Sequence, residues 1–405
     1  MKINDRNIIY LDNNSTTPTD PIVLETMLPY FNVNFGNAAS NTHILSWQAE
    51  SAVDNATNQI AKLINAEPYE IIYTSGATES NNLIFKGLSF TENDHIIISN
   101  IEHKCVLESA KYQHKENRVE LSFIDVNSNG EIDLNKFKAL IKPNTKLVSI
   151  MLTNNEIHSI NPIKKISEIC KSYDLLLHID AAQGIGKMNI DVKDLGINLM
   201  SVSSHKFYGP KGVGILYMKE GINKTTIKPL FLGGGQEKGL RSGTLPVPLI
   251  VGLGKASELA LDFLTNQQDK IQNIKSLTQN MFYSIRNEIN EVQLNGSDFE
   301  NRQLGGLNIS FPNIDTGELQ FLIPHICFSR GSACSSGSLD YSYVLKAIGL
   351  TVDLAVGTMR MSVSKFNTKD EIEIATNDII AAVKKLYKSK HFSNPFTNIN
   401  EITNA

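Results

Sequence analysis

Five short apolar runs, each followed by polar residues, constrain the fold of this chain most strongly. They lie at 71–73, 95–98, 147–152, 175–179 and 199–202, and segments of helical character separate them. Strands that alternate with helices form a mostly parallel sheet covered by helices on both faces. We therefore expect an α/β fold whose large domain holds a mostly parallel sheet. The polar residues after the strands should meet at one edge, where such folds bind ligands.

The chain changes in character after residue 262. A long polar helix is predicted over about 265–290, followed by strands of alternating hydrophobicity over 307–311 and 359–363. A chain of 405 residues also exceeds the size of one small core. We expect a large domain over 16–262, a smaller α+β domain formed by 1–15 with 263–388, and a polar tail over 389–405.

Composition and charge exclude several classes of function. A net charge of −4 gives no basic footprint for nucleic acid or an anionic membrane. The longest apolar stretch, 245–264, is broken by Lys255, Glu258 and Asp262, so no membrane-spanning helix is expected. The start of the chain lacks an apolar signal core, and the four cysteines form no CxxC pair. We expect a cytoplasmic protein that binds neither nucleic acid nor membrane and has no resident metal.

The residues after the fifth run carry the most informative chemistry. Ser203, Ser204, His205 and Lys206 follow the apolar residues directly, and a Gly/Pro-rich loop follows them. Hydroxyl, imidazole and amine groups at the end of a buried strand need partners or a function. A lysine in such a place can form a Schiff base with an aldehyde cofactor, most commonly pyridoxal 5'-phosphate (PLP). An ordinary surface loop with a solvated lysine is the alternative.

Two other strand ends offer groups that suit the same cofactor. The glycine turn at 74–78 leads into a helix, where backbone N–H groups at Ala77 and Thr78 suit a phosphate, although Thr78 can equally be a plain helix cap. A carboxylate at Asp180 would keep a pyridine nitrogen protonated; the alternative is a turn aspartate. Asp180 precedes Lys206 by 26 residues, about one strand–helix–strand unit, which predicts that the two lie on neighbouring strands.

Further polar residues follow the remaining strands. His103 can stack on a ring and move protons, although a lone histidine is often structural. Asn155 and Gln183 can hydrogen-bond a ring hydroxyl or the substrate. Ser203 and His205 flank Lys206 and can complete a phosphate site.

Cys334 is the candidate nucleophile among the cysteines. It lies in a Ser/Gly-rich loop at about 328–340, with Arg330 nearby to favour a thiolate; an incidental surface cysteine is the alternative. Cys170 and Cys327 resemble core residues, and the role of Cys105 stays open with a structural role favoured. Arg360 has the side chain that best clamps a carboxylate, but the pattern alone does not separate it from a surface-strand arginine.

Taken together, residues 8–388 resemble the cysteine desulfurases of the IscS/NifS family, on the PLP fold type I scaffold. The resemblance rests on a set of matching motifs: Tyr-Leu-Asp-Asn from Tyr10, Thr-Ser-Gly-Ala-Thr-Glu-Ser-Asn from Thr74, Glu-His-Lys from Glu102, Asn-Asn-Glu-Ile from Asn154, His-Ile-Asp-Ala-Ala-Gln from His178, Ser-His-Lys-Phe-Tyr-Gly-Pro-Lys-Gly from Ser204, Gly-Gly-Gly-Gln-Glu from Gly233, Arg-Ser-Gly-Thr-Leu-Pro from Arg241 and Gly-Ser-Ala-Cys from Gly331.

The resemblance implies an α/β fold whose large domain has a mostly parallel seven-stranded sheet, and it implies a role for each candidate residue. It implies that Lys206 holds PLP and that Cys334 takes sulfur from L-cysteine as a persulfide, leaving L-alanine. The other implied cofactor contacts are Asp180 at the pyridine nitrogen, His103 on the ring, Gln183 and Asn155 at its hydroxyl side, and Ala77, Thr78, Ser203 and His205 at the phosphate. Thr244 would reach the phosphate of the other subunit in a homodimer, and Arg360, with Asn155, would bind the substrate.

The implied partners are L-cysteine, a second copy of the chain, and an iron–sulfur scaffold protein or another sulfur acceptor, including tRNA-thiolation enzymes. Cys334 would at most ligate an iron–sulfur cluster transiently with a scaffold partner. The chain departs from the family pattern at Arg330, at His158 and in the tail 389–405. Another fold type I lyase, such as a selenocysteine lyase, and an inactive scaffold stay as alternatives. Cys334 on its loop argues against the first. Lys206, Asp180, His103 and Cys334 together argue against the second.

Overall fold

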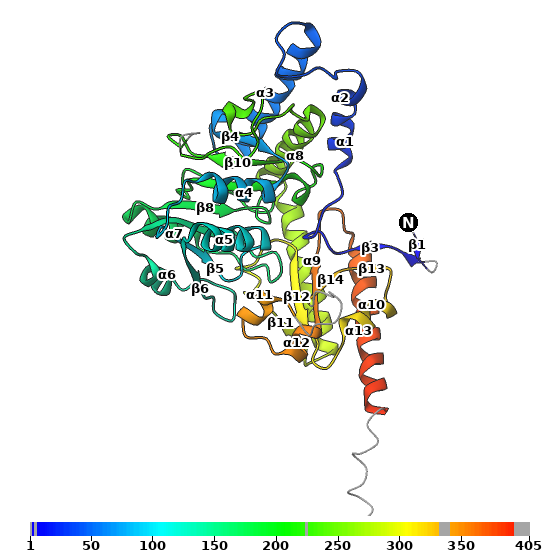
Figure 1. The fold of residues 1–405 in the computed structure, drawn as a ribbon. Coiled ribbons are helices and arrows are strands. Elements are labelled where there is room, and N and C mark those ends of the chain that lie inside the picture. Colours follow the sequence, from blue (N-terminus) through cyan, green and yellow to red (C-terminus); the bar gives the residue numbers. More distant parts are fainter. Residues whose placement is uncertain (1, 4–5, 223–225, 332–340, 393–405) are drawn as a thin grey trace, which may run out of the picture. The chain divides into compact units, whose positions relative to one another are not determined.

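A computed structural model describes residues 2–3, 6–222, 226–331 and 341–392 (Figure 1). The chain divides into two compact units. The larger unit comprises 14–271 with 296–304, and the smaller unit comprises 1–13, 272–295 and 305–405. In the described part of the chain, no helix is both long enough and apolar enough to cross a bilayer.

A seven-stranded sheet forms the centre of the larger unit. Its spatial order is β4-β10-β9-β8-β7-β5-β6, and β10 alone runs antiparallel to its neighbours. The strands are β4 (Ile71–Thr74), β5 (His95–Ser99), β6 (Glu120–Ile124), β7 (Thr145–Met151), β8 (Leu176–Asp180), β9 (Leu199–Ser203) and β10 (Gly214–Met218). The predicted α/β fold with a mostly parallel sheet is confirmed, and β6 and β10 are the two strands that the apolar runs did not indicate.

Helices pack around this sheet. They are α1 (Pro21–Met27), α2 (Pro29–Asn32), α3 (Ile44–Ile64), α4 (Ala77–Gly87), α5 (Lys104–Asn117), α6 (Leu134–Leu140), α7 (Ile163–Ser172) and α8 (Val247–Asn266), with 3₁₀ turns η1 (Pro68–Glu70), η2 (Ser204–Lys206) and η3 (Glu237–Gly239). The long helices α3 and α8 pack against each other. A Cβ on Gly254 would lie 2.5 Å from the Cα of Ala56, so glycine permits this close approach.

The smaller unit contains an antiparallel sheet of order β11-β12-β15-β14. These strands are β11 (Gln293–Leu294), β12 (Gly306–Ser310), β14 (Ser329–Arg330) and β15 (Thr358–Ser362); β3 (Ile9–Tyr10) pairs in parallel with β13 (Ile326–Cys327), and β1 (Lys2–Ile3) with β2 (Arg6–Asn7) in antiparallel. Its helices are α10 (Thr316–Leu322), α11 (Tyr343–Ala347), α12 (Val352–Val356) and α13 (Lys369–Phe392), with most of α9 (Gln268–Glu288). The helix expected over about 265–290 is confirmed as α9, which begins at Gln268, two residues after α8 ends at Asn266.

Candidate functional site

The carboxyl ends of β4, β5, β7, β8 and β9 face one edge of the larger sheet, as predicted. Thr74 at the end of β4 and Ser203 at the end of β9 both pair with Gly214 of β10. A Cβ on Gly214 would lie 2.7 Å from the Cα of Gly76 and 2.3 Å from the carbonyl oxygen of Val202. Only glycine leaves room for this approach, which brings the turn after β4 beside the turn that carries Lys206.

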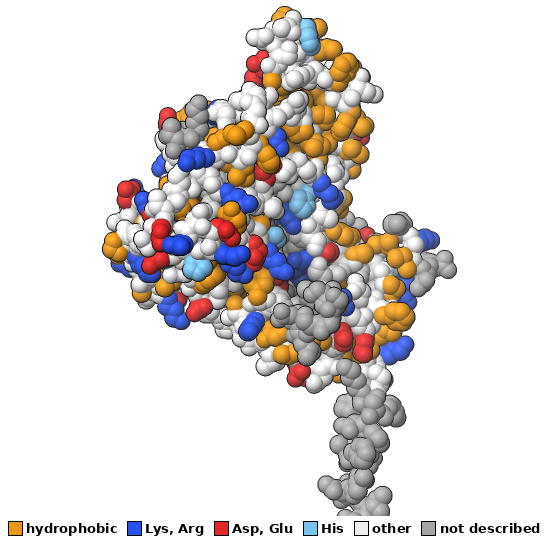
Figure 2. Space-filling view, viewed as in Figure 1, with side chains coloured by type: hydrophobic (Ala, Val, Ile, Leu, Met, Phe, Trp, Pro, Cys, Tyr) orange, Lys and Arg blue, Asp and Glu red, His pale blue; other side chains and the backbone are white. Residues whose placement is uncertain are grey.

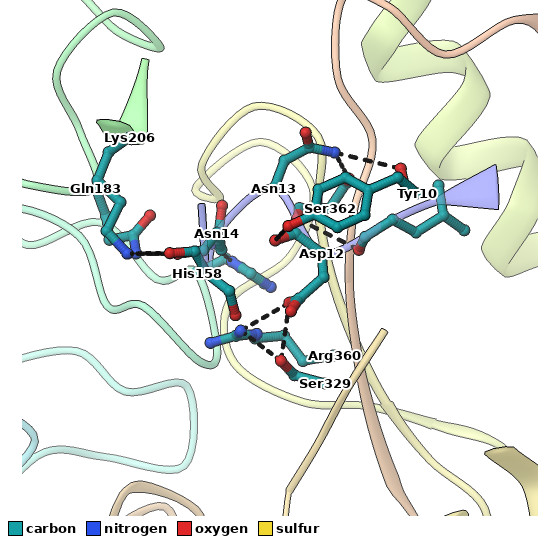
Figure 3. Close-up of polar contacts among 12 residues, drawn as sticks. Tyr10, Asp12, Asn13, Asn14, His158, Gln183, Lys206, Ser329, Arg360 and Ser362 are labelled. Carbon is teal, nitrogen blue, oxygen red and sulfur yellow. Dashed lines mark hydrogen bonds and ion pairs between the residues drawn. The ribbon is translucent and has the colours of Figure 1, made fainter. Parts of the chain in front are cut away.

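Lys206 ends the 3₁₀ turn η2, which follows β9 directly. Its Nζ donates hydrogen bonds to the backbone oxygens of Asn14 at 2.8 Å and Ser15 at 2.9 Å (Figure 3). Both acceptors belong to the larger unit. The two backbone carbonyls hold the amine in one position. This suits a lysine that must react with the carbonyl carbon of a bound aldehyde.

Asp180 is the last residue of β8, and β8 pairs in parallel with β9. The predicted placement of Asp180 and Lys206 on neighbouring strands is therefore confirmed. Asp180 is buried, and its oxygens accept hydrogen bonds from the Ala182 N–H at 3.0 Å and from Asn81 Nδ2 at 2.9 Å. Among the described residues it forms no ion pair, so a protonated ring nitrogen is the kind of partner that this buried carboxylate suits.

The turn between β4 and α4 offers hydrogen-bond donors to an anion. Gly76 precedes α4 with a φ of 147°, and no side chain caps the helix. The backbone N–H groups of the first turn, at Ala77 and Thr78, are therefore not bound by a capping side chain. A Cβ on Gly76 would lie 3.3 Å from the Ser203 hydroxyl, so this hydroxyl borders the same turn. The predicted phosphate residues on these two turns are thus neighbours.

His205 lies in the same turn as Lys206. Its Nδ1 is 3.0 Å from the hydroxyl of Thr16. Desolvation, followed by the charges of Lys206 and Lys211, lowers the pKa of His205 to about 4. The imidazole is therefore neutral at neutral pH in the ligand-free protein, where it can donate one hydrogen bond.

His103 caps the amino end of α5, after β5. Its Nδ1 accepts a hydrogen bond from the backbone N–H of Cys105 at 3.2 Å. Desolvation lowers the pKa of His103, and the charge of Asp180 opposes that shift. A neutral ring whose Nδ1 accepts a hydrogen bond carries its proton on Nε2, which is the state of an acid–base residue poised to exchange one proton.

Asn14 is a central residue of the site that sequence reasoning missed. Its backbone oxygen accepts hydrogen bonds from Lys206 and, at 2.8 Å, from Gln183 Nε2. Its side-chain oxygen accepts from Lys187 Nζ and Gln303 Nε2, both at 3.0 Å. The nearest sequence indication of a functional role for Asn14 is the Tyr-Leu-Asp-Asn motif, which ends one residue before it. That motif does not indicate contacts with residues almost two hundred positions away.

His158 joins this network from the turn after β7, a turn that also carries Asn155. His158 is fully buried at a φ of 66°, a conformation that side-chain-bearing residues rarely adopt. Its Nδ1 lies 2.9 Å from Asn14 Nδ2, so the amide donates to the ring (Figure 3). The departure at this position therefore contributes a side chain to the Asn14 network.

The smaller unit carries the candidate carboxylate clamp. Arg360 of β15 donates from one guanidinium nitrogen to Asp12 Oδ1 at 2.8 Å and to the Ser329 hydroxyl at 2.7 Å, and that hydroxyl donates to Asp12 Oδ1 at 2.8 Å (Figure 3). Asp12 was not predicted as a site residue. It holds the guanidinium in one orientation, which a bidentate contact with a substrate carboxylate would need.

Two predicted residues remain, Thr244 and Cys334. Thr244 is exposed in the segment after Arg241, whose Nε pairs with Glu79 of α4 at 3.0 Å. Cys334 lies outside the described residues, as does most of the loop 328–340. Of the other cysteines, Cys170 is buried in α7 and Cys327 is half-buried in β13.

Glu102 is a fully buried carboxyl group directly before His103. Its Oε1 accepts hydrogen bonds from the Met151 N–H at 2.8 Å and from the Ser99 hydroxyl at 2.5 Å. Burial nevertheless raises the pKa of Glu102 to about 8. The group is therefore protonated and neutral at neutral pH, which keeps a second negative charge away from Asp180.

This raised pKa predicts a pH-dependent loss of stability. Between the ordinary pKa of 4.5 and the folded value of about 8, the folded protein keeps a proton that the unfolded chain has released. The free energy of unfolding should therefore fall with rising pH by up to about 1.4 kcal/mol per pH unit from this group. Glu102→Gln mimics the protonated carboxyl and should remove that part of the slope in urea unfolding of the apoprotein.

Glu120→Gln is the matched control. Glu120 is exposed, and its hydrogen bond with Lys142 lowers its pKa, so it is ionised throughout this pH window. That variant should keep the wild-type slope. Equal slopes in Glu102→Gln and the wild type would show that Glu102 is already ionised in the folded protein.

The groups at the edge of the larger sheet fit PLP. An amine held by two carbonyls, a buried carboxylate without an ion-pair partner in the described structure, and an uncapped helix terminus beside a serine hydroxyl match the aldehyde, the ring nitrogen and the phosphate of that cofactor.

Known proteins that are similar to this chain agree with a PLP site. The family model described as aminotransferase class-V matches residues 9–374. A cysteine desulfurase IscS of Rickettsia prowazekii (strain Madrid E) is 45% identical over 382 residues, covering 93% of this chain and 92% of that protein. One of Ehrlichia chaffeensis (strain ATCC CRL-10679 / Arkansas) is 44% identical over 381 residues, with 93% and 92% covered.

Solved structures are similar over the same length. A structure titled "NIFS-like protein" matches with a TM-score of 0.85 and 35% identity, covering 93% of this chain and all of that chain. One titled "SspA in complex with cysteine" matches with a TM-score of 0.76 and 37% identity, covering 89% of this chain and 99% of that chain.

Proposed function

Because the chain belongs to the aminotransferase class-V family, we propose that it is a PLP-dependent cysteine desulfurase that converts L-cysteine to L-alanine and passes the sulfur on as a persulfide. The similarity to IscS proteins over 93% of the chain is the observation that carries this conclusion. The similarity to a structure titled as a complex with cysteine supports the substrate.

Each site residue has a proposed task. Lys206 holds the cofactor and moves a proton at its Nζ, Asp180 faces the ring nitrogen, and His103 lies on the ring. Asn155 and Gln183 bind the hydroxyl side, and Arg360 binds the carboxylate of the substrate. Ala77, Thr78, Ser203 and His205 bind the phosphate. When bound, PLP supplies an electron sink that stabilises negative charge on the substrate.

Cys334 carries the sulfur transfer. Its thiolate attacks the sulfur of the substrate cysteine, so an S–S bond forms while the bond between that sulfur and the β-carbon breaks. The β-carbon keeps the electron pair of the broken bond, gains a proton and becomes the methyl group of alanine. A persulfide remains on Cys334, and two equivalents of an external thiol reduce it to sulfide and restore the thiol.

A turnover assay tests the function. Purified protein with PLP, L-cysteine and an excess of a thiol reductant should release alanine and sulfide in equal amounts. L-serine, which has no sulfur to transfer, is the matched control and should give neither alanine nor sulfide. A folded protein that binds PLP but releases no alanine from cysteine would contradict the proposal.

The sulfur acceptor is proposed as an iron–sulfur scaffold protein or a tRNA-thiolation enzyme, in the cytoplasm. The names of the IscS relatives support the desulfurase activity. The three cysteines described by the structure are free thiols, which agrees with a reducing compartment.

We also propose that the enzyme is a homodimer, with Thr244 reaching the cofactor of the second copy. A cluster of large apolar side chains supports this, each at least 47% exposed: Ile22, Leu24, Leu28, Phe31, Val33, Phe35, Ile44 and Trp47. They lie on α1, α2 and the start of α3 or in the segments directly beside α2, where Figure 2 shows hydrophobic side chains gathered at the surface. An apolar surface of this extent is typical of an interface between protein chains.

A charge placed in this cluster should weaken the dimer. Phe31→Glu puts a carboxylate where the interface would exclude water, and we expect the dimer dissociation constant to rise about 100-fold. Light scattering during size-exclusion chromatography over a dilution series measures this change. Phe321→Glu is the control, because Phe321 is 85% exposed on α10, outside the cluster. Identical dissociation of both variants and the wild type would contradict this interface.

A further inference from the structure

Cys105 lies in the first turn of α5, between two residues of the candidate site. Its Sγ is 2.9 Å from Nδ1 of His103 and 3.0 Å from Nδ2 of Asn81. We propose that Cys105 is a positioning residue whose thiol acts beside its own backbone N–H to hold the His103 imidazole in one orientation, and joins it through Asn81 to Asp180. The sequence left the role of Cys105 open, and the proposed function assigns it none.

The His103 side of this contact fixes the direction of the hydrogen bond. Nδ1 of His103 already accepts from the backbone N–H of Cys105, so it carries no proton in the neutral ring. A thiol S–H can donate to the same nitrogen, whereas a thiolate would set two lone pairs against each other. Desolvation, followed by the charge of Asp180, raises the pKa of the Cys105 thiol to about 12. The sulfur therefore keeps its proton and acts as a donor to His103.

Asn81 holds the sulfur from the other side. Its Nδ2 has two hydrogens, one for Cys105 Sγ and one for the Asp180 carboxylate at 2.9 Å. A carboxylate accepts but does not donate, so Asp180 fixes which end of the amide points toward it. Asn81 is fully buried in α4 and cannot exchange these partners for water.

One hydrogen-bonded path thus runs from Asp180 through Asn81 and Cys105 to His103. Its consequence is that the imidazole presents Nε2–H away from the path while Nδ1 is occupied on two sides. The thiol is a weak S–H donor that orients His103 and does not itself react. The expected effect of this path on kcat rests on the proposed function, but the orientation and protonation of the His103 imidazole do not.

A pair of substitutions separates positioning from packing. Cys105→Ala removes the donor, and Cys105→Ser restores an O–H donor at nearly the same place. Cys170→Ala is the control, because it removes a buried thiol of α7 outside the site. Nitrogen-15 NMR of labelled histidines in the apoprotein, with the His103 signal assigned by its loss in His103→Gln, should show a single Nε2-protonated ring in the wild type, Cys105→Ser and Cys170→Ala. Cys105→Ala keeps the backbone N–H at position 105 and therefore the same tautomer, but it should shift the Nδ1 resonance of His103, because one of the two donors to that nitrogen is lost.

In the PLP-loaded enzyme, Cys105→Ala should lower kcat about fivefold with little change in KM, as expected when one supporting hydrogen bond is lost. Cys105→Ser should recover most of that loss. An unchanged Nδ1 resonance of His103 in Cys105→Ala would overturn the inference, and so would a Cys105→Ser variant with the same shifted resonance as the alanine variant. The apoprotein spectra decide this even if cysteine is not the substrate.

Discussion

Lys206→Ala should yield a folded protein that has lost the visible absorbance of lysine-linked PLP and turns over L-cysteine at least about 10³-fold more slowly. Lys206 supplies the amine that binds the aldehyde, and its Nζ is held by the carbonyls of Asn14 and Ser15. Removing it leaves the core of the sheet intact, because the side chain is not part of that core. Absorbance spectra and an alanine assay measure both effects.

Lys187→Ala is the matched control for this prediction. Lys187 donates to the side chain of Asn14 at 3.0 Å and to Gln183 at 3.3 Å, so it belongs to the same network without holding the cofactor. That variant should keep the visible absorbance. An undiminished absorbance band in Lys206→Ala would show that another lysine holds the cofactor.

Cys334→Ser should keep the cofactor absorbance and lose sulfide release by at least about 10³-fold. A serine hydroxyl is not ionised at neutral pH and does not form a persulfide, whereas PLP binding depends on residues of the larger unit. Spectra and a sulfide assay on the same preparation separate the two functions.

Cys327→Ser provides the control for Cys334→Ser, since Cys327 is a half-buried thiol of β13. Its raised pKa, caused by desolvation and the charge of Asp12, makes it a poor nucleophile. It should retain sulfide release. If Cys334→Ser turned over cysteine at the wild-type rate, the nucleophile would have to be sought elsewhere in the chain.

The residues at the edge of the larger sheet could be predicted because each strand and the polar residues that follow it are contiguous in the sequence. Each parallel strand is an uninterrupted apolar run with polar residues at its carboxyl end, and the 26 residues between Asp180 and Lys206 match one strand–helix–strand unit. The sequence did not indicate strands β6 and β10, for two different reasons. β6 lies at the sheet edge, where the polar residues Glu120 and Ser122 interrupt the apolar pattern, and β10 is an antiparallel strand that follows a Gly/Pro loop.

The supporting residues could not be predicted because their contacts span long stretches of sequence. Asn14 meets Lys206 only after the chain has built most of the sheet, and Asp12 meets Arg360 only when β15 has formed. The role of Cys105 stayed open, with a structural role favoured, because a sequence shows neither its contact with Asn81 nor the direction of that amide. Local patterns place the reacting groups, whereas tertiary packing selects the residues that orient them.

The measurement that tests the central claim most directly is the site of the persulfide. Protein loaded with PLP and given L-cysteine without reductant should form about one alanine per chain and then stop, because the sulfur stays on the enzyme. Mass spectrometry of the digested protein should find one added sulfur atom on the peptide that contains Cys334. Alanine formed with the added sulfur on Cys105, Cys170 or Cys327, or with no added sulfur on the chain, would contradict this account.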